Sequence, residues 1–248
     1  RSTRRRGVLR MKGATILGCG IVDEVGIAGT RGITATWSGL DMVAPGTART
    51  MRAVFDKEDP TFRRIDLLAR ALVLACEAAD LENVLTAEQR QDAAICVETD
   101  LGALATDVSF ASSLGDECVH AGIFPYSLTS TSLGEVALRY KLRGPTISMS
   151  VRDDAVPSER DPALAGESVR ESLRMLACGD CQHVVTGVVD TMLEPAAGKP
   201  AILRAVVAVI AAPSSHDATG SGLGAGLGTL EWPNGKTDPF AQFVSMCR

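Results

Sequence analysis

The feature of this sequence that most constrains its fold is an alternation of short apolar runs with amphipathic segments. The apolar runs have the length and composition of buried strands and are bounded by glycine, proline or polar residues; they are Gly13–Val22, Asp92–Thr99, Thr146–Val151, His183–Val189 and Ala201–Ala212. Because alternating strands and helices pack as helical layers over a sheet, the sequence predicts an α/β fold. We expect a mixed, mostly parallel sheet covered by helices on both faces.

Helical periodicity is clearest between Pro60 and Asp80, where one apolar stripe contains Ile65, Leu68, Leu72 and Ala75. Two capping boxes mark further helix starts. Thr86 with Gln89 predicts a short helix, and Ser132 with Glu135 predicts a helix through Val136 and Tyr140 that stops before Gly144 and Pro145. A turn at Gly102 leads into another helix, and a last one is expected over about 163–177, ending in a turn at Gly179.

The composition agrees with this fold class and with one domain. The 248 residues are 46% hydrophobic but 4% aromatic, so the core must be built mainly from aliphatic side chains, and the length suits one large domain. We expect residues 11–248 to form that domain, with a flexible glycine-rich loop at about 214–228. The first ten residues, which include five arginines, are expected to be a disordered tail or an expression artefact.

Charge and hydropathy exclude two classes of function. A formal net charge of -5 argues against nucleic-acid binding, because phosphate contacts need a surplus of Lys and Arg on one face. The longest apolar run, Ala201–Pro213, is shorter than the roughly 18 to 20 residues of a membrane span. Seven cysteines without a regular framework fit a reducing compartment, so the expected location is the cytoplasm.

Several short motifs suggest chemistry that their contexts do not support. Gly18 and Gly20 follow the dinucleotide pattern for two positions, but Asp23 replaces the third glycine. Cys178 and Cys181 form a CxxC without a second pair at zinc-ligand spacing. The run GSGLGAGLG lacks the Lys and Ser or Thr of a phosphate loop. We therefore expect no cofactor and no metal.

The segment Pro125–Ser150 resembles the stretch that leads to the active site of beta-ketoacyl synthases, which have the thiolase-like fold. Its sequence is PYSLTSTSLGEVALRYKLRGPTISMS, and the matching residues are Pro125, Gly134, Tyr140, Leu142, Arg143, Gly144 and Pro145. Other pieces follow in family order: the strand with Gly18 and Gly20, the helix around 65–79, ICVET before Gly102, and LACGDCQHVVTGVVD. The resemblance spans about 13–190 and implies the N-terminal half of that fold.

The departures from the family concern its catalytic residues. The family's nucleophilic cysteine falls at Asp153, between Arg152 and Asp154, and no cysteine occurs between Cys118 and Cys178. A carboxylate cannot replace a thiolate that must carry the acyl chain as a thioester. Asp153 and Asp154 could in principle act as paired carboxylates, but a solvated polar loop is the favoured interpretation. The family's catalytic histidines come from its other half, so His120, His183 and His216 are expected to be structural or exposed.

What remains is similar to short, cysteine-less chain-length-factor-type homologues of ketosynthases. The resemblance implies a non-catalytic subunit of type II fatty acid or polyketide/aryl-polyene biosynthesis, which forms a heterodimer with an active ketosynthase and shapes the tunnel for an acyl chain carried on an acyl carrier protein. The candidate tunnel or interface residues are Leu104, Val108, Phe110, Ser130 and Leu133. Two alternatives stay open: a divergent thioester-processing enzyme, either a decarboxylase or an acyl hydrolase, and a homodimeric acyl-binding module.

Overall fold

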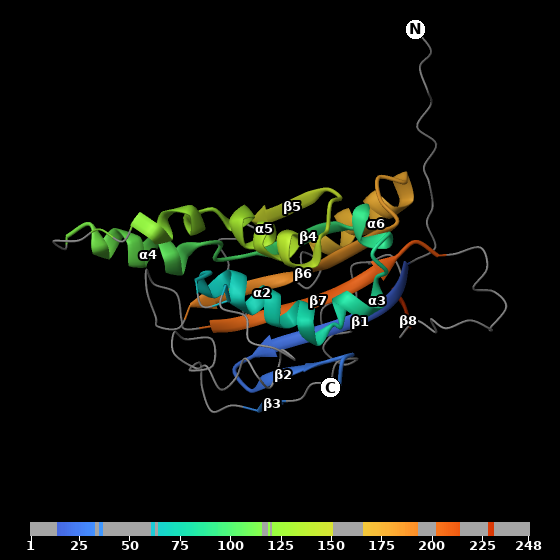
Figure 1. Ribbon diagram of the computed structural model, residues 1–248, viewed down its shortest axis with the longest axis horizontal. Helices are drawn as coiled ribbons and strands as arrows, with labels where there is room; N and C mark the ends of the chain where they lie inside the picture. Colours follow the sequence, from blue (N-terminus) through green and yellow to red (C-terminus); the bar gives the residue numbers. More distant parts are fainter. Residues whose placement is uncertain are drawn as a thin grey trace, which may run out of the picture.

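The protein folds around one twisted sheet with helices on both faces (Figure 1). The computed structural model describes residues 14–32, 35–36, 61–62, 64–115, 119, 121–150, 166–192, 202–213 and 228–230. The strands are β1 (Ala14–Asp23), β2 (Gly26–Gly29), β3 (Ala35–Thr36), β4 (Ala94–Thr99), β5 (Thr146–Ser150), β6 (His183–Met192), β7 (Ile202–Ala211) and β8 (Gly228–Leu230). Their order is β3-β2-β1-β7-β6-β4-β5, and β8 also pairs with β1.

The predicted α/β class and the mixed sheet are confirmed, but the expectation of a mostly parallel sheet is wrong. Strand β4 runs parallel to β5 and β6, whereas the other five pairings are antiparallel. The link between β6 and β7 spans residues 193–201, which is too short for the crossover that a parallel neighbour needs. Strand β7 therefore runs back between β6 and β1, and β1 turns into β2 as a hairpin.

Helices α2 and α5 cover one face of the sheet, and α6 covers the other. The helical segments are α2 (Leu67–Ala78), α3 (Leu81–Val84), α4 (Leu104–Ser113), α5 (Thr129–Tyr140) and α6 (Glu167–Cys178), with 3₁₀ segments η2 (Gln89–Gln91) and η3 (Ala121–Ser127). Figure 1 shows α4 projecting sideways beyond the end of the sheet. We call α4, η3 and the described residues that flank them, from Leu104 to Leu128, the arm.

Alternate residues of the central strands supply two separate apolar cores. Val185 and Val207 face α2 and α5, while their neighbours Val184 and Val206 face α6. This is the strand period of two, applied to a sheet that is buried on both sides. The near-continuous aliphatic sequence of β6 and β7 follows from this double burial.

The glycines near the chain start lie inside β1 and not in a phosphate-binding turn. A Cβ atom at Gly20 would lie 2.1 Å from the carbonyl oxygen of Ala75, and one at Gly18 would lie 2.3 Å from that of Ala79. Only glycine lets the strand backbone approach α2 this closely. The GxG motif is therefore a packing feature between β1 and α2.

One of the two predicted capping boxes is confirmed. The Thr86 N–H donates to Gln89 Oε1 at 2.8 Å, and the Gln89 N–H donates to Thr86 Oγ1 at 3.2 Å, at the entry to η2. The box of Ser132 and Glu135 is wrong, because α5 already begins at Thr129. These two side chains bond to distant partners instead: Ser132 to Asp66 at 3.5 Å and Glu135 to Tyr126 at 3.0 Å.

Strands β2, β3 and β8 were not predicted. The β1–β2 hairpin is closed by Asp23, whose Oδ1 accepts from the N–H groups of Val25 at 2.9 Å and Gly26 at 3.1 Å. Gly228, the last residue of the predicted glycine-rich loop, opens β8. The rest of that loop and the tail over residues 1–10 lie outside the described residues.

Candidate functional site

The carboxyl ends of β1, β4, β5 and β6 meet at one edge of the sheet, where β7 begins. Ligands of open α/β sheets usually bind at this edge. Several charged side chains gather here: Arg204 on β7 lies opposite Asp23 of β1 and Asp190 of β6 in the strand register. The edge is therefore the first place to look for chemistry.

Asp190 is a buried carboxylate whose two oxygens both accept hydrogen bonds from other residues of the chain. Its side chain is 1% exposed, and Oδ1 accepts from Thr99 Oγ1 at 2.9 Å and from the N–H groups of Asp100 at 2.8 Å and Leu101 at 3.0 Å. Oδ2 accepts from Arg204 Nη2 at 2.6 Å. Since these bonds occupy both oxygens, Asp190 braces the edge and is not placed to move protons.

The N-terminus of α6 is occupied by another buried carboxylate, Glu98 of β4. Its Oε2 accepts from the Ser168 N–H at 2.8 Å, and its Oε1 accepts from the Gly166 N–H at 3.3 Å. A helix N-terminus favours an anion and can lower the pKa of a nearby thiol. Here the Glu98 carboxylate already accepts hydrogen bonds from the free N–H groups at the start of α6. Its negative charge would also disfavour a thiolate beside it.

Arg152, Asp153 and Asp154, the predicted position of the degenerate nucleophile, lie outside the described residues, and so do Cys118 and Cys247. The described cysteines do not supply a replacement thiolate at this edge. Burial raises the pKa of Cys96 to about 12 and that of Cys181 to about 11. Cys96 Sγ lies 3.9 Å from Met149 Sδ of β5, within the apolar core under α6. These two thiols are protonated at neutral pH and serve as packing.

The remaining candidates do not form a second centre among the described residues. His183 stands at the start of β6, at the opposite edge of the sheet, and burial lowers its pKa although Asp92 lies 3.9 Å away. Cys178 and Cys181 of the CxxC are both free thiols, the first exposed and the second buried. In the described part of the chain, no cluster of three or more His, Cys, Asp or Glu could hold a metal. His120 and His216 lie outside it.

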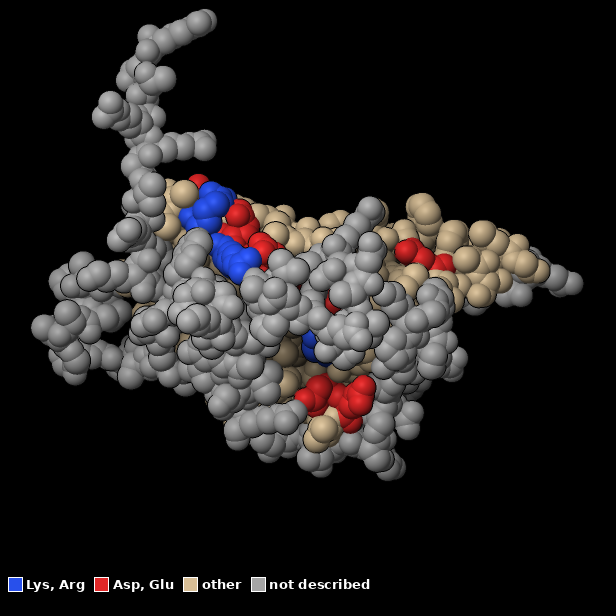
Figure 2. Space-filling model, turned by 180° about the vertical axis from the view of Figure 1, so that it is seen from behind, with Lys and Arg blue, Asp and Glu red and all other residues tan. Residues whose placement is uncertain are grey.

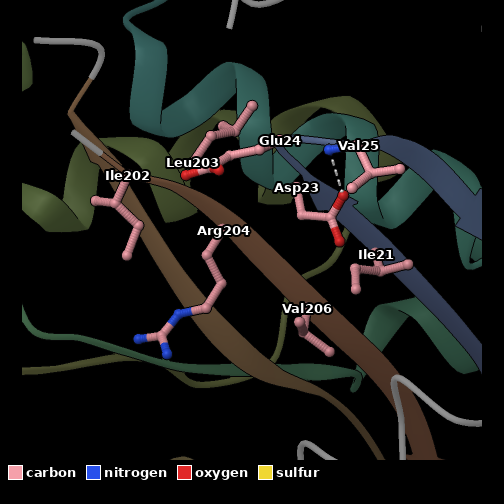
Figure 3. A pocket seen from close by; sticks show the side chains of 8 residues that line it. All are labelled: Ile21, Asp23, Glu24, Val25, Ile202, Leu203, Arg204 and Val206. Atoms are coloured by element: carbon pink, nitrogen blue, oxygen red, sulfur yellow. Dashed lines mark hydrogen bonds between the residues drawn. The ribbon is translucent and has the colours of Figure 1, made fainter. Parts of the chain in front are cut away.

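A pocket of about 380 Å³ opens beside Arg204 (Figure 3). One wall is the β1–β2 hairpin and the other is the start of β7; the lining residues are Ile21, Asp23, Glu24, Val25, Ile202, Leu203, Arg204 and Val206. The pocket contains an aliphatic surface and one guanidinium, which Asp190 already neutralises. With two further carboxylates in the lining, the pocket is unsuited to a phosphate or carboxylate ligand.

The predicted tunnel or interface residues divide between the arm and the core. Leu104, Val108 and Phe110 are half-buried on α4, and Ser130 is exposed in the first turn of α5. A Cβ atom at Gly102 would lie 3.3 Å from Thr129 Oγ1, so α4 and α5 begin side by side. Leu133, by contrast, is fully buried in the core.

The arm exposes more apolar surface than was predicted. Large hydrophobic side chains stand in solvent on and beside it: Leu114, Val119, Phe124 and Leu128, with Leu138 further along α5. Phe124 is 59% exposed although its ring packs on Phe110 with centroids 5.4 Å apart. The signal that could have revealed this surface is the scarcity of charge, since the sequence between Leu101 and Gly134 contains three charged side chains, Asp107, Asp116 and Glu117. Figure 2 shows the arm almost entirely in uncharged tan.

Asp66 joins the arm to the core. Its Oδ1 accepts from the Ala69 N–H at 2.9 Å, which caps α2, and from Ser132 Oγ of α5 at 3.5 Å. Its Oδ2 accepts from Thr106 Oγ1 of α4 at 3.2 Å. Burial raises the pKa of this carboxyl group against the opposing effect of these bonds and of Arg70.

None of the described helices is long and apolar enough to cross a membrane. No protein-family model and no curated protein sequence matches the chain.

Solved structures do match. The ishigamide ketosynthase/chain length factor aligns with a TM-score of 0.56 and 15% identity over 84% of this chain and 63% of its own. A ketosynthase in complex with its chain length factor from Xenorhabdus doucetiae aligns with a TM-score of 0.51 and 16% identity over 82% of this chain and 80% of its own. A type II PKS acyl-carrier protein in complex with its ketosynthase bound to the hexaketide gives a TM-score of 0.52, with 15% identity over 82% and 63%.

The chain thus spans 63% of the length of two of these matches. Identities this low establish architecture and leave activity open. Together with the sheet order, the two helical layers and the position of α6 after β5, they confirm the resemblance on which the fold was predicted. The chain has the thiolase-like fold of the ketosynthase and chain length factor proteins.

Proposed function

We propose that this chain is a non-catalytic, chain-length-factor-type subunit of type II fatty acid or polyketide/aryl-polyene biosynthesis in the cytoplasm. It pairs with an active ketosynthase and shapes the tunnel for an acyl chain delivered by an acyl carrier protein. The observation that carries the proposal is the charge-poor, exposed apolar surface of the arm.

The arm has the composition of a stable protein interface. Interface cores are depleted in charge and enriched in aromatic and aliphatic side chains. The side chains of Leu114, Phe124 and Leu128 are 59%, 59% and 62% exposed. Such a concentration of exposed apolar groups marks a surface that a partner covers.

Strand β5 provides a second contact beside the arm. Within the described sheet it ends the strand order and pairs with β4 alone. Its exposed residues, Thr146, Ser148 and Ser150, alternate with half-buried Ile147 and Met149. An open edge strand presents unpaired N–H and C=O groups to which a strand of another subunit can add.

The chemistry at the carboxyl edge supports a subunit without its own condensation activity. A ketosynthase needs a thiolate, and here the N-terminus of α6 holds the Glu98 carboxylate, while burial raises the pKa of the Cys96 thiol of the same strand to about 12. The heterodimeric arrangement is supported by the similar structures, one of which is a ketosynthase with its chain length factor and another of which includes an acyl-carrier protein.

The tunnel wall is proposed to include Leu104, Val108 and Phe110 of α4, with Ser130 at the rim. Leu133 is fully buried in the core between the sheet and its helices, so we include it as a support of the wall and not as part of its surface. The half-buried state of the three α4 side chains leaves each with a free side for a partner or an acyl chain.

The proposal is tested by co-expressing the chain with the ketosynthase of its own organism and measuring the affinity of the pair. Leu128→Asp should weaken the pair by about 30-fold, because it puts a charge into the centre of an apolar interface. Val25→Asp is the matched control, since Val25 is also 62% exposed but lies on the β1–β2 hairpin. Equal effects of the two substitutions, or no complex with the unaltered chain, would overturn the proposal.

The same experiment separates the alternatives. A stable homodimer that Leu128→Asp dissociates would replace the heterodimer with an acyl-binding module. Turnover of malonyl or acyl thioesters by the purified chain, lost on Asp153→Ala, would replace both with a divergent enzyme.

A further inference from the structure

We propose that Asp190 is a positioning residue for the arm: its buried carboxylate fixes the turn between β4 and α4 and so sets the direction in which the partner surface leaves the sheet. The inference rests on the proposed function of the arm as a docking surface. It concerns a side chain on β6 that lies in the core of the molecule, away from the exposed apolar residues themselves.

The turn is held almost entirely by side-chain acceptors. Asp190 Oδ1 accepts the N–H groups of Asp100 and Leu101, at 2.8 and 3.0 Å, together with the hydroxyl of Thr99 at 2.9 Å. Thr99 Oγ1 in turn accepts the Gly102 N–H at 2.8 Å. Three successive amides are thus fixed on two side chains, and Gly102 takes the left-handed conformation with φ of +58° that starts α4.

Packing alone holds α4 weakly. Of its ten residues, Ser113 alone is fully buried, whereas α6 buries six of its twelve. The N-cap residue Ala103 has no side chain that could cap the helix. Beyond the turn, α4 is tied to the core by the Thr106–Asp66 hydrogen bond, and η3 is tied to α5 by the Tyr126–Glu135 hydrogen bond. The Phe110–Phe124 contact joins the two parts of the arm to each other. The polar turn is therefore the main restraint on the first residues of α4.

Arg204 keeps the carboxylate of Asp190 in place. Its Nη2 lies 2.6 Å from Asp190 Oδ2 and 3.5 Å from Asp100 Oδ2, so one guanidinium contacts both Asp190 and the turn. We call the bonds by which Asp190 and Thr99 hold the turn the clamp. A buried carboxylate without such a partner is strongly destabilising. Figure 3 shows Arg204 reaching from β7 along the pocket.

The test is hydrogen exchange of the isolated chain, read by mass spectrometry of its peptides. Asp190→Asn keeps the size of the side chain but replaces one acceptor oxygen with a donor. Exchange over residues 100–113 should then accelerate by about tenfold while β1 and β7 stay within about twofold of the unaltered chain. Asp180→Asn, at an exposed position after α6, is the control and should change neither region. Equal acceleration throughout, or none over 100–113, would overturn the proposal.

A second pair of variants covers the case in which Asp190→Asn does not fold. Thr99→Val removes the hydroxyl that links Asp190 to Gly102, and Thr99→Ser retains it. The valine variant should reproduce the local acceleration over 100–113, and the serine variant should restore protection. If both behave alike, Thr99 is merely a packing residue and the clamp is wrong.

Affinity for the ketosynthase is measured separately. Asp190→Asn should weaken the pair by about tenfold, less than Leu128→Asp, because it displaces the surface without removing it. The exchange experiment uses the chain alone, so it stands even if no partner binds. A local exchange effect without any ketosynthase complex refutes the proposed function, whereas a complex sensitive to Leu128→Asp without an exchange effect refutes the clamp.

Discussion

Two regions of the molecule are rich in aliphatic residues: the sheet with its two helical layers, and the arm. The first region buries these side chains, whereas the second exposes several of them. In the layers, β6 and β7 bury nearly every side chain, and α2 buries ten of its twelve residues. In the arm, Leu114, Phe124 and Leu128 stand in solvent. Apolar content alone therefore does not distinguish a segment that builds its own core from one that leaves its apolar side chains exposed.

The two regions also differ in what holds them. The layers are fixed by contact of backbone on backbone and by interleaved side chains, as where β1 meets α2 at Gly18 and Gly20. The arm is fixed by a few directional bonds, from Asp190 to the turn and from Asp66 to Thr106. A region held in this way can be shifted by a single substitution without loss of the fold.

The largest expected effect on stability contrasts Leu133, which lies inside α5, with Leu128, the N-cap residue of the same helix. Leu133→Ala should lower the free energy of unfolding by about 2 to 5 kcal/mol, because the side chain is fully buried. Leu128→Ala, at a side chain that is 62% exposed, should change it by less than about 0.5 kcal/mol. Urea unfolding of the isolated chain measures both. Similar losses for the two variants would mean that the arm is part of the core.

A smaller effect is expected at the strand–helix contact. Gly20→Ala should destabilise the fold by about 3 kcal/mol, because the new methyl group would meet the Ala75 carbonyl and the backbone of α2 cannot recede without moving β1. Gly134→Ala in α5 is the control; its methyl group meets nothing within 4 Å, so it should stabilise the chain by up to about 1 kcal/mol. Chemical denaturation of the Gly20→Ala and Gly134→Ala variants measures the sign and size of both changes in unfolding free energy. A neutral Gly20→Ala would contradict the close approach.

The smallest effect lies at Asp66, which joins the two regions. Burial raises the pKa of its carboxyl group, so the protonated form is favoured in the folded state and its contribution to stability is lost as the pH rises through the folded pKa. Relative to Asp66→Asn, the unaltered chain should therefore gain stability between pH 7 and pH 4.5. The readout is the difference in unfolding free energy at the two pH values. A difference that falls on acidification would show that the bonds from Thr106 and Ala69 outweigh burial.

Much of the layered region could be predicted from the sequence, because its signals are local. The predicted apolar runs correspond to β1, β4, β5, β6 and β7. The apolar stripe at Ile65, Leu68 and Leu72 corresponds to α2 and the two residues before it. The turn residues Gly102 and Gly179 both adopt positive φ, as glycine permits. These features depend on neighbours within a few residues of each other.

The parts that escaped prediction depend on distant partners. Ser132 was assigned to a helix start, but its hydroxyl bonds to Asp66, 66 residues away. Strand β2 has four residues and forms because Asp23 closes the hairpin. Such a short strand has no apolar periodicity from which it could be predicted. The clamp on the β4–α4 turn joins Asp190 to residues about 90 positions earlier. Among the candidate site residues, sequence placed Leu104, Val108 and Phe110 on one helix but did not separate buried Leu133 from exposed Ser130.

The carboxylate at the start of α6 bears on how hard it would be to turn this chain into a condensing enzyme. Glu98 already supplies the negative charge that the helix end attracts, and it does so from β4, the strand next to β5. We expect that grafting a single cysteine ahead of α6 would yield an inert thiol. A reactive thiol at this position would also require a neutral residue in place of Glu98, because the carboxylate would otherwise oppose the thiolate at the helix end.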